Sequence, residues 1–147
     1  MEIELLPKLD EKATCRNVHN FFKYQLENIV LMSGHRMTDL QSPSFDSIPS
    51  GSHVNSAELK VVNGLDAQNV VKSVYDALHH IDDLSYTILT GIYLKYERWV
   101  DIQPYVGREH TSFGKYKNRA LVAFAYSFEA WQILNNCDHV IDLKETV

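Results

Sequence analysis

The chain has 147 residues, enough for one domain with its own hydrophobic core. Hydrophobic residues make up 45% of it and aromatic residues 11%, which excludes a disordered or low-complexity chain. The net charge of −5 argues against a protein that coats nucleic acid through bulk charge, but it leaves room for a local basic patch.

No segment indicates a membrane or secreted protein. The first residues lack the basic and long apolar parts of a secretory signal, and no apolar run approaches the roughly 18 residues of a membrane span. Cys15 and Cys137 fit no metal or redox spacing, so we interpret them as reduced thiols. We therefore expect a cytoplasmic protein without membrane contact.

The N-terminal part of the chain predicts one long helix. Apolar residues recur at helical spacing between Val18 and Val30, which indicates a helix from about Asp10 to Met32 that ends at Gly34. Between residues 33 and 56 the composition changes to Ser, Pro, Gly, His and Asp. Such a composition predicts a linker or an ordered long loop.

Further helices are expected after this loop. Asn55 and Glu58 resemble a capping box, so we expect a short helix over about Ser56–Asn63. Asp66 then caps the helix with the clearest apolar stripe of the chain. This stripe consists of Val70, Val71, Val74, Ala77, Leu78 and Ile81.

The second half of the chain continues in the same way, so the predicted fold class is all-α. Asp82 and Asp83 open a helix to about Tyr96, where acidic residues suit a helix N-terminus. A short helix near Trp99–Val106 and a long one over about His110–Asn135 follow. Strand periodicity is absent, apart from a short extended piece near Val140, Ile141 and Leu143.

The segment Lys95–Arg119 carries the most informative pattern. It holds six Lys or Arg residues against three Asp or Glu, a net +3 in a chain whose remainder is −8. Ile102 and Val106 are expected to pack inward, and Gly107 suits the turn before the helix that restarts near His110. This order of elements is typical of a helix-turn-helix, whose second helix lies in the DNA major groove.

Helical phasing assigns the long helix an apolar and a polar face. At 100° per residue, Phe113, Tyr116, Ala120, Phe124, Phe128 and Trp131 share one face. The opposite face supplies donors for bases and phosphates, and the helix entry supplies two more. The predicted DNA-binding residues are Arg108 and His110 at the entry and Thr111, Ser112, Lys115, Asn118 and Arg119 on the face.

Other residues of the segment fit less well, and a simpler interpretation stays open. Lys117 points closer to the apolar face, and Pro104 removes a backbone N–H late in the short helix. Gly114 lowers helix stability by roughly 1 kcal/mol relative to Ala, although glycine can also permit a close approach of the helix backbone. The basic face is equally compatible with an ordinary solvated helix surface.

The remaining polar residues match no catalytic or metal motif. His79 and His80 suit the end of a helix, and His19, His35, His53 and His139 are interpreted as surface or loop residues. Phosphate-binding glycine loops and nucleophile motifs are absent. The aromatic residues of the two long helices are interpreted as core or oligomer contacts. We therefore expect no enzyme, no metal and no cofactor.

Several short motifs, in their order and spacing, resemble the autolysin regulatory protein (ArpU-like) family of phage and prophage transcriptional regulators. They are residues 6–12 (LPKLDEK), residues 42–49 (SPSFDSIP), Asn55 with Glu58, and residues 107–121 followed by Ala123-Phe124-Ala125. The resemblance implies a helix-turn-helix like that of sigma-factor region 4, and control of late, lysis or packaging genes. Glu109 and Gly114 depart from the family's usual residues.

Together these observations divide the chain into an N-terminal helical arm (1–32), a linker (33–56) and a helical DNA-binding domain (57–147) with its helix-turn-helix at about 83–134. The expected partner is double-stranded DNA in the bacterial cytoplasm and nucleoid, with host RNA polymerase and a second copy of the chain as further candidates. The alternative is a non-enzymatic phage structural or DNA-packaging adaptor that oligomerises through its helices. An enzyme ranks below both.

Overall fold

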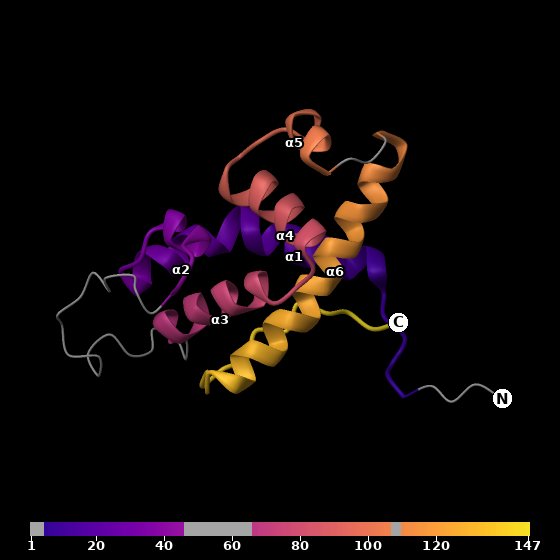
Figure 1. Ribbon diagram of the computed structural model, residues 1–147. Coiled ribbons are helices and arrows are strands. Elements are labelled where there is room, and N and C mark those ends of the chain that lie inside the picture. Colours follow the sequence, from indigo (N-terminus) through magenta and orange to yellow (C-terminus); the bar gives the residue numbers. More distant parts are fainter. Residues whose placement is uncertain (1–4, 46–65, 107–109) are drawn as a thin grey trace.

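The computed structural model describes residues 5–45, 66–106 and 110–147 (Figure 1). Within the helices, the side chains of Gln103, Tyr105, Val106, His110 and Thr111 also lie outside the description. The described residues form helices, turns and extended segments, and they contain no β-strand. The expected all-α class is confirmed.

The predicted N-terminal helix is present, but it contains an irregular turn. It consists of α1 (Glu11–Asn20), the π-helical turn η1 (Phe21–Gln25) and α2 (Leu26–Ser33). The Asp10 carboxylate caps its start by accepting a backbone N–H of the first turn at 3.1 Å. Gly34 ends it with φ of 82°, a left-handed conformation that glycine adopts at little cost.

The described part of the region expected to be a linker, up to residue 45, contains one short ordered element. This is the 3-10 helix η2 (Met37–Gln41), whose Leu40 is fully buried. Residues 46–65 lie outside the described part of the chain, and with them the short helix expected over about 56–63 and its capping residues Asn55 and Glu58.

The later helices begin and end close to the predicted residues. Asp66 and Asp82 cap two of them, each accepting a backbone N–H from the first turn. The second of these helices continues into another π-helical turn. The elements are α3 (Ala67–His79), α4 (Asp83–Leu89) with the turn η3 (Thr90–Leu94), α5 (Trp99–Val106) and α6 (His110–Leu134).

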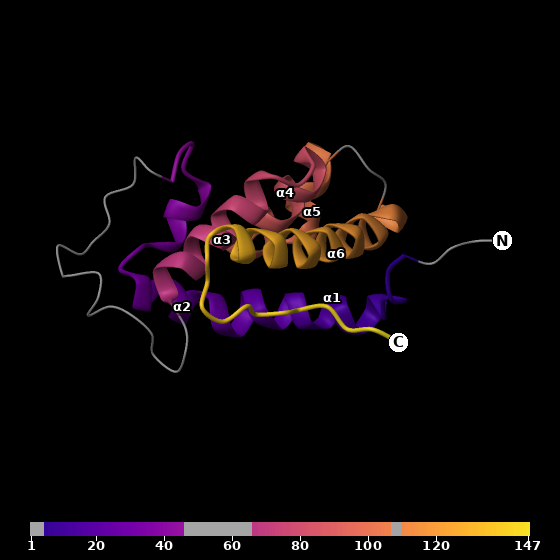
Figure 2. The same ribbon diagram turned by 90° about the horizontal axis from the view of Figure 1, so that it is seen from below.

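The long helix α6 is the centre of the fold. It packs against α1, α3 and α4 (Figure 1), and α1 lies on the other side of α6 from α4 and α5 (Figure 2). Phe21 of η1 contacts Phe124 and Phe128 of α6 with ring centroids 6.3 and 5.1 Å apart. The expected arm therefore shares one hydrophobic core with α6, which also includes residues of α3.

The C-terminal tail returns along α1. The fully buried Gln132 holds the tail through two 2.8 Å hydrogen bonds, donating to the Ile141 carbonyl and accepting the Ile141 N–H. The tail then runs antiparallel to α1 (Figure 2), and Thr146 forms an isolated bridge with Leu9. The expected extended piece near residues 140–143 is present in this tail. Among the described residues, no helix has both the length and the apolar character that crossing a membrane requires.

Candidate nucleic-acid interface

A small second core holds the start of α6. Ile88 of α4, Ile102 of α5 and Phe113 of α6 are all buried and pack together, with Trp99 and Tyr116 at the edge. The rings of Trp99 and Phe113 lie 6.0 Å apart. The inward position predicted for Ile102 is confirmed. This three-helix packing holds the start of α6, while residues from Ala120 onward hold the same helix in the main core.

The predicted division of α6 into two faces is confirmed for the described side chains. Ala120, Phe124 and Phe128 are fully buried and Phe113 nearly so, whereas the polar face points to solvent. On that face Lys115, Asn118 and Arg119 are exposed and Ser112 is half-buried. Arg108 and the turn around Gly107 lie outside the described residues, as do the side chains of His110 and Thr111.

Arg119 lies between an aromatic ring and an acidic neighbour. Its guanidinium carbon is 5.5 Å from the centre of the Tyr116 ring, a geometry that holds the side chain against the helix. Burial alone raises the pKa of Asp82, but hydrogen bonds from the backbone and hydroxyl of Ser85, with a smaller contribution from Arg119, lower it overall. Arg119 therefore lies within electrostatic range of the cap of α4.

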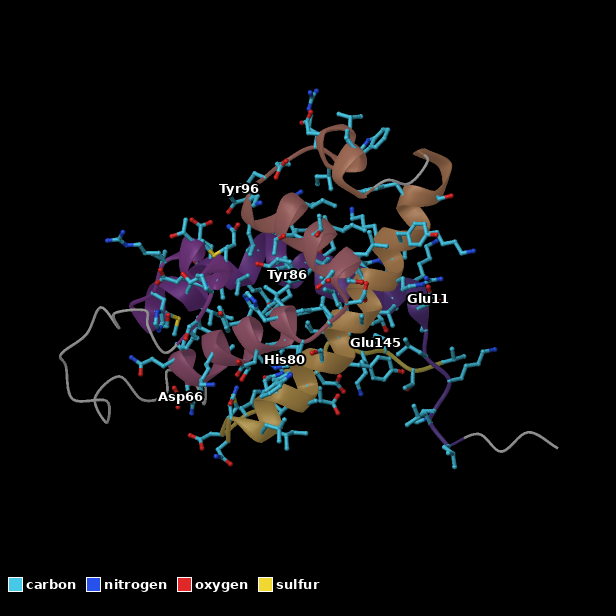
Figure 3. The ribbon with its side chains drawn as sticks, in the orientation of Figure 1. Glu11, Asp66, His80, Tyr86, Tyr96 and Glu145 are labelled. Atoms are coloured by element: carbon cyan, nitrogen blue, oxygen red, sulfur yellow. The ribbon has the colours of Figure 1, made fainter. Side chains whose placement is uncertain are left out.

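Lys115 also has an acidic neighbour, on its other side. Together with Glu11, Arg119 and Val122 it lines a shallow hollow of about 340 Å³. Glu11 belongs to the first turn of α1, which begins beside the N-terminal half of α6 (Figure 3). The polar face thus carries two adjacent cations, one turn apart, with Glu11 and Asp82 at its borders. Sequence reasoning missed both acidic residues, because no local pattern places them beside α6.

Other basic residues of the segment that the structure describes lie away from this face. The Lys117 ammonium lies 5.9 Å from the centre of the Tyr93 ring, on the side of α6 that packs on the core, as predicted. Arg98 pairs with Asp101 at 3.4 Å in an exposed i, i+3 contact on α5. Of the described cations in the segment, only Lys115 and Arg119 share the polar face.

The two residues that weakened the helix-turn-helix pattern have different surroundings. Pro104 is exposed and lies within α5, which retains its helical form from Trp99 to Val106. Gly114 is exposed on α6, and a Cβ atom built on it meets no atom within 4 Å. Nothing in the fold therefore requires glycine at this position.

Two of the histidines expected to be surface or loop residues are more enclosed than a surface position: His35, which does lie in the loop between α2 and η2, and His19, which lies in α1. His35 is buried, with its ring 4.9 Å from that of Phe45. His19 is half-buried, and its Nδ1 lies 2.7 Å from the Tyr93 hydroxyl. Both contacts join residues that are distant or irregularly spaced in sequence, so no local pattern reveals them.

One of the two adjacent histidines caps the C-terminal end of α3, and the other makes a different contact. His80 Nδ1 lies 2.7 Å from the Asp76 carbonyl, which confirms the capping role expected there. His79 Nε2 instead lies 2.9 Å from the Leu40 carbonyl, and its ring stacks on Tyr75. In the part of the chain that the structure describes, no three His, Cys, Asp or Glu side chains gather in a group that could hold a metal ion.

Comparison with known proteins finds no matching family model, no matching curated protein and no matching solved structure. Lys115 and Arg119 provide two cations about 6 Å apart along the helix, a spacing suited to neighbouring phosphate oxygens. Asn118 provides a carboxamide, the group that pairs with the major-groove edge of adenine.

Proposed function

We propose that the protein is a sequence-specific DNA-binding regulator of transcription that places the N-terminal half of α6 in the major groove. The observation that carries this proposal is the polar face formed by the half-buried Ser112 and the exposed Lys115, Asn118 and Arg119, on a helix whose other face is anchored in two cores. A recognition helix needs both: donors on one side and rigid support on the other.

The packing of α4, α5 and α6 supports a helix-turn-helix. The small core of Ile88, Ile102 and Phe113 joins three consecutive helices, as such a unit requires. In this proposal α5 is the supporting helix and α6 the recognition helix, in an arrangement like that of sigma-factor region 4. Arg108, His110 and Thr111 complete the contacts at the helix entry.

The acidic borders of the face favour specific over general binding. Glu11 and Asp82 lie on either side of the Lys115 and Arg119 pair, and they repel phosphates that approach outside the groove. Together with the net charge of −5, they weaken attachment to arbitrary DNA. Affinity then depends on base contacts, which suits a regulator better than a packaging or coating protein.

The biological setting rests on the resemblance to the ArpU-like family. In this setting the protein controls late, lysis or packaging genes of a phage or prophage, in the host cytoplasm and nucleoid. Host RNA polymerase and a second copy of the chain are the partners that such a regulator contacts. The function needs no cofactor.

Selection of bound sites from random double-stranded DNA tests the proposal. We expect one defined motif, and we expect the Lys115→Ala, Arg119→Ala double variant to lose it. A matched control is the Lys23→Ala, Arg36→Ala double variant, which removes the same charge near the ends of α2, away from the start of α6 (Figure 1). Recovery of no motif, or equal recovery with both double variants, would contradict the proposal.

A second candidate is the phage structural or DNA-packaging adaptor. The observation that favours it is a set of exposed apolar residues at helix ends: Leu31 and Met32 on α2, and Ile133 and Leu134 on α6, between 40% and 68% exposed. Native mass measurement distinguishes the two functions. A closed ring of many copies without DNA motif supports the adaptor, whereas a monomer or dimer with a motif supports the regulator.

A further inference from the structure

Two helices each contain one π-helical turn, and both turns border the same cavity. The turns are η1 (Phe21–Gln25) and η3 (Thr90–Leu94), and the cavity between them measures about 290 Å³. π-helical turns are rare, and they occur often at functional sites because the extra residue redirects side chains. The cavity lies apart from Ser112, Lys115, Asn118 and Arg119, none of which lines it.

One wall of the cavity is aromatic. The rings of Phe22 and Tyr93 stack on each other with centroids 4.9 Å apart and planes inclined by 13°, and the two residues are only 5% and 6% exposed, so they present edges to the cavity. Ring edges suit the face of a planar ring in an edge-to-face contact. An engineered cavity of roughly 150 Å³ accommodates benzene, so this volume holds one ring with a substituent.

Tyr96 completes the wall in an unfavourable backbone conformation. It has φ of 55° and follows η3, where the Glu97 N–H donates to the Gly91 carbonyl at 2.8 Å (Figure 3). A residue in the left-handed conformation at a helix end is usually glycine. A tyrosine there is strained, and 70% of it is exposed, so packing does not explain it. Its ring lines the cavity.

The polar groups around the cavity leave a net positive charge. The His19 Nδ1 shares a 2.7 Å hydrogen bond with the Tyr93 hydroxyl. Burial lowers the pKa of His19, as do Lys117 and Lys23, and burial raises the pKa of Tyr93, so both groups are neutral near pH 7. Of the charged groups that line the cavity, the Lys23 ammonium and the Glu27 carboxylate balance each other. Lys117 does not line the cavity, but its ammonium lies 5.9 Å from the centre of the Tyr93 ring and adds a positive charge nearby.

We propose that this cavity is a binding site for a small organic anion with a planar ring, such as an aromatic carboxylate. The ring lies against the exposed Tyr96 and meets the edges of Phe22 and Tyr93, and the acidic group points toward Lys23 and the His19–Tyr93 pair. The site does not depend on the proposed DNA-binding function, since it uses a different part of the molecule.

Titration of the full chain with three aromatic acids tests the site: benzoate, nicotinate and indole-3-acetate, each followed by amide chemical shifts in NMR spectra. We expect at least one to bind saturably, with shifts concentrated in η1 and η3. The matching neutral amide is expected to bind about fivefold more weakly, because one charge contact in partly exposed surroundings contributes about 1 kcal/mol. Absence of saturable binding by all three acids, or equal binding of acid and amide, overturns the proposal.

Two variants separate binding from folding. Lys23→Met removes a cation at the cavity and is expected to weaken binding about fivefold, whereas the control Lys12→Met removes an exposed cation about 16 Å away along the helix and is expected to have no effect. Tyr96→Gly relieves the backbone strain, so it is expected to raise the melting temperature by about 3 °C while weakening binding. Unchanged affinity in Tyr96→Gly, or equal losses in Lys23→Met and Lys12→Met, refutes the site.

Discussion

Replacing Gly114 with alanine is expected to stabilise the protein, whereas the same change at Gly91 is expected to destabilise it. At Gly114 the new methyl group meets no atom within 4 Å, so only the helix propensity changes, by about 1 kcal/mol in favour of alanine. At Gly91 the new Cβ lies 2.8 Å from Ile102 Cδ1 and 3.0 Å from its Cγ1. Ile102 is 2% exposed and β-branched, which restricts its χ1 angle, so relieving the contact requires a shift of this buried side chain.

The overpacking at Gly91 outweighs the gain in helix propensity. Inserting a methyl group into a packed core costs about 1–3 kcal/mol, so we expect a net loss of about 1 kcal/mol for Gly91→Ala. For a chain of this size, thermal unfolding followed by circular dichroism should show shifts of about +3 °C for Gly114→Ala and −3 °C for Gly91→Ala. Equal shifts in the same direction would refute the close packing of Ile102 in α5 against Gly91 in η3.

Gly114→Ala also tests why this position is glycine. The fold does not need it, since the Cβ position is open and the residue is exposed on α6. A stable variant with reduced DNA affinity indicates that the backbone of α6 approaches the DNA closely at this point. A stable variant with unchanged affinity shows that no such approach occurs.

Three further changes test the fold around α6. Gln132→Leu leaves the N–H and C=O of Ile141 without their hydrogen-bond partners, so the free energy of unfolding in urea should fall by about 2 kcal/mol. An unchanged free energy of unfolding would mean that other contacts hold the C-terminal tail. Asp82→Ala removes the cap of α4 and should cost about 1 kcal/mol, which an unchanged urea midpoint would contradict. The pKa of His19 in the folded state is lowered from its ordinary 6.5, so the unfolded chain binds this proton at a higher pH than the folded protein does. The free energy of unfolding should therefore fall as the pH drops from about 7 toward 5. His19→Gln should make the free energy of unfolding depend less on pH in this range, and an unchanged pH dependence would contradict the burial of His19.

Much of the helical architecture follows from local signals. Asp66 and Asp82 cap helices because their carboxylates reach N–H groups three residues away, and Gly34 ends α2 because it adopts a positive φ. These effects act within one helical turn, so a single sequence reveals them. The phasing of α6 is equally local, which is why the exposure of Lys115 and Arg119 was predictable.

Other features depend on residues far apart in the chain. Neither π-helical turn was predicted, since an inserted residue alters the apolar spacing only slightly. The burial of His35 and the pairing of His19 with Tyr93 arise from tertiary packing. The same holds for Glu11, which begins α1 but borders the polar face of α6. The acidic surroundings of the candidate interface could therefore be identified only from the structure, whereas its central residues could be predicted from the sequence.

The salt dependence of DNA binding tests the central proposal most directly. With a selected site, the logarithm of the affinity should fall linearly with the logarithm of the salt concentration, and the Lys115→Ala, Arg119→Ala variant should lower the slope by about two. Its affinity should fall by at least about tenfold, whereas the Lys23→Ala, Arg36→Ala control should retain both slope and affinity. Equal slopes for the wild-type protein and the Lys115→Ala, Arg119→Ala variant would show that the polar face of α6 does not contact DNA.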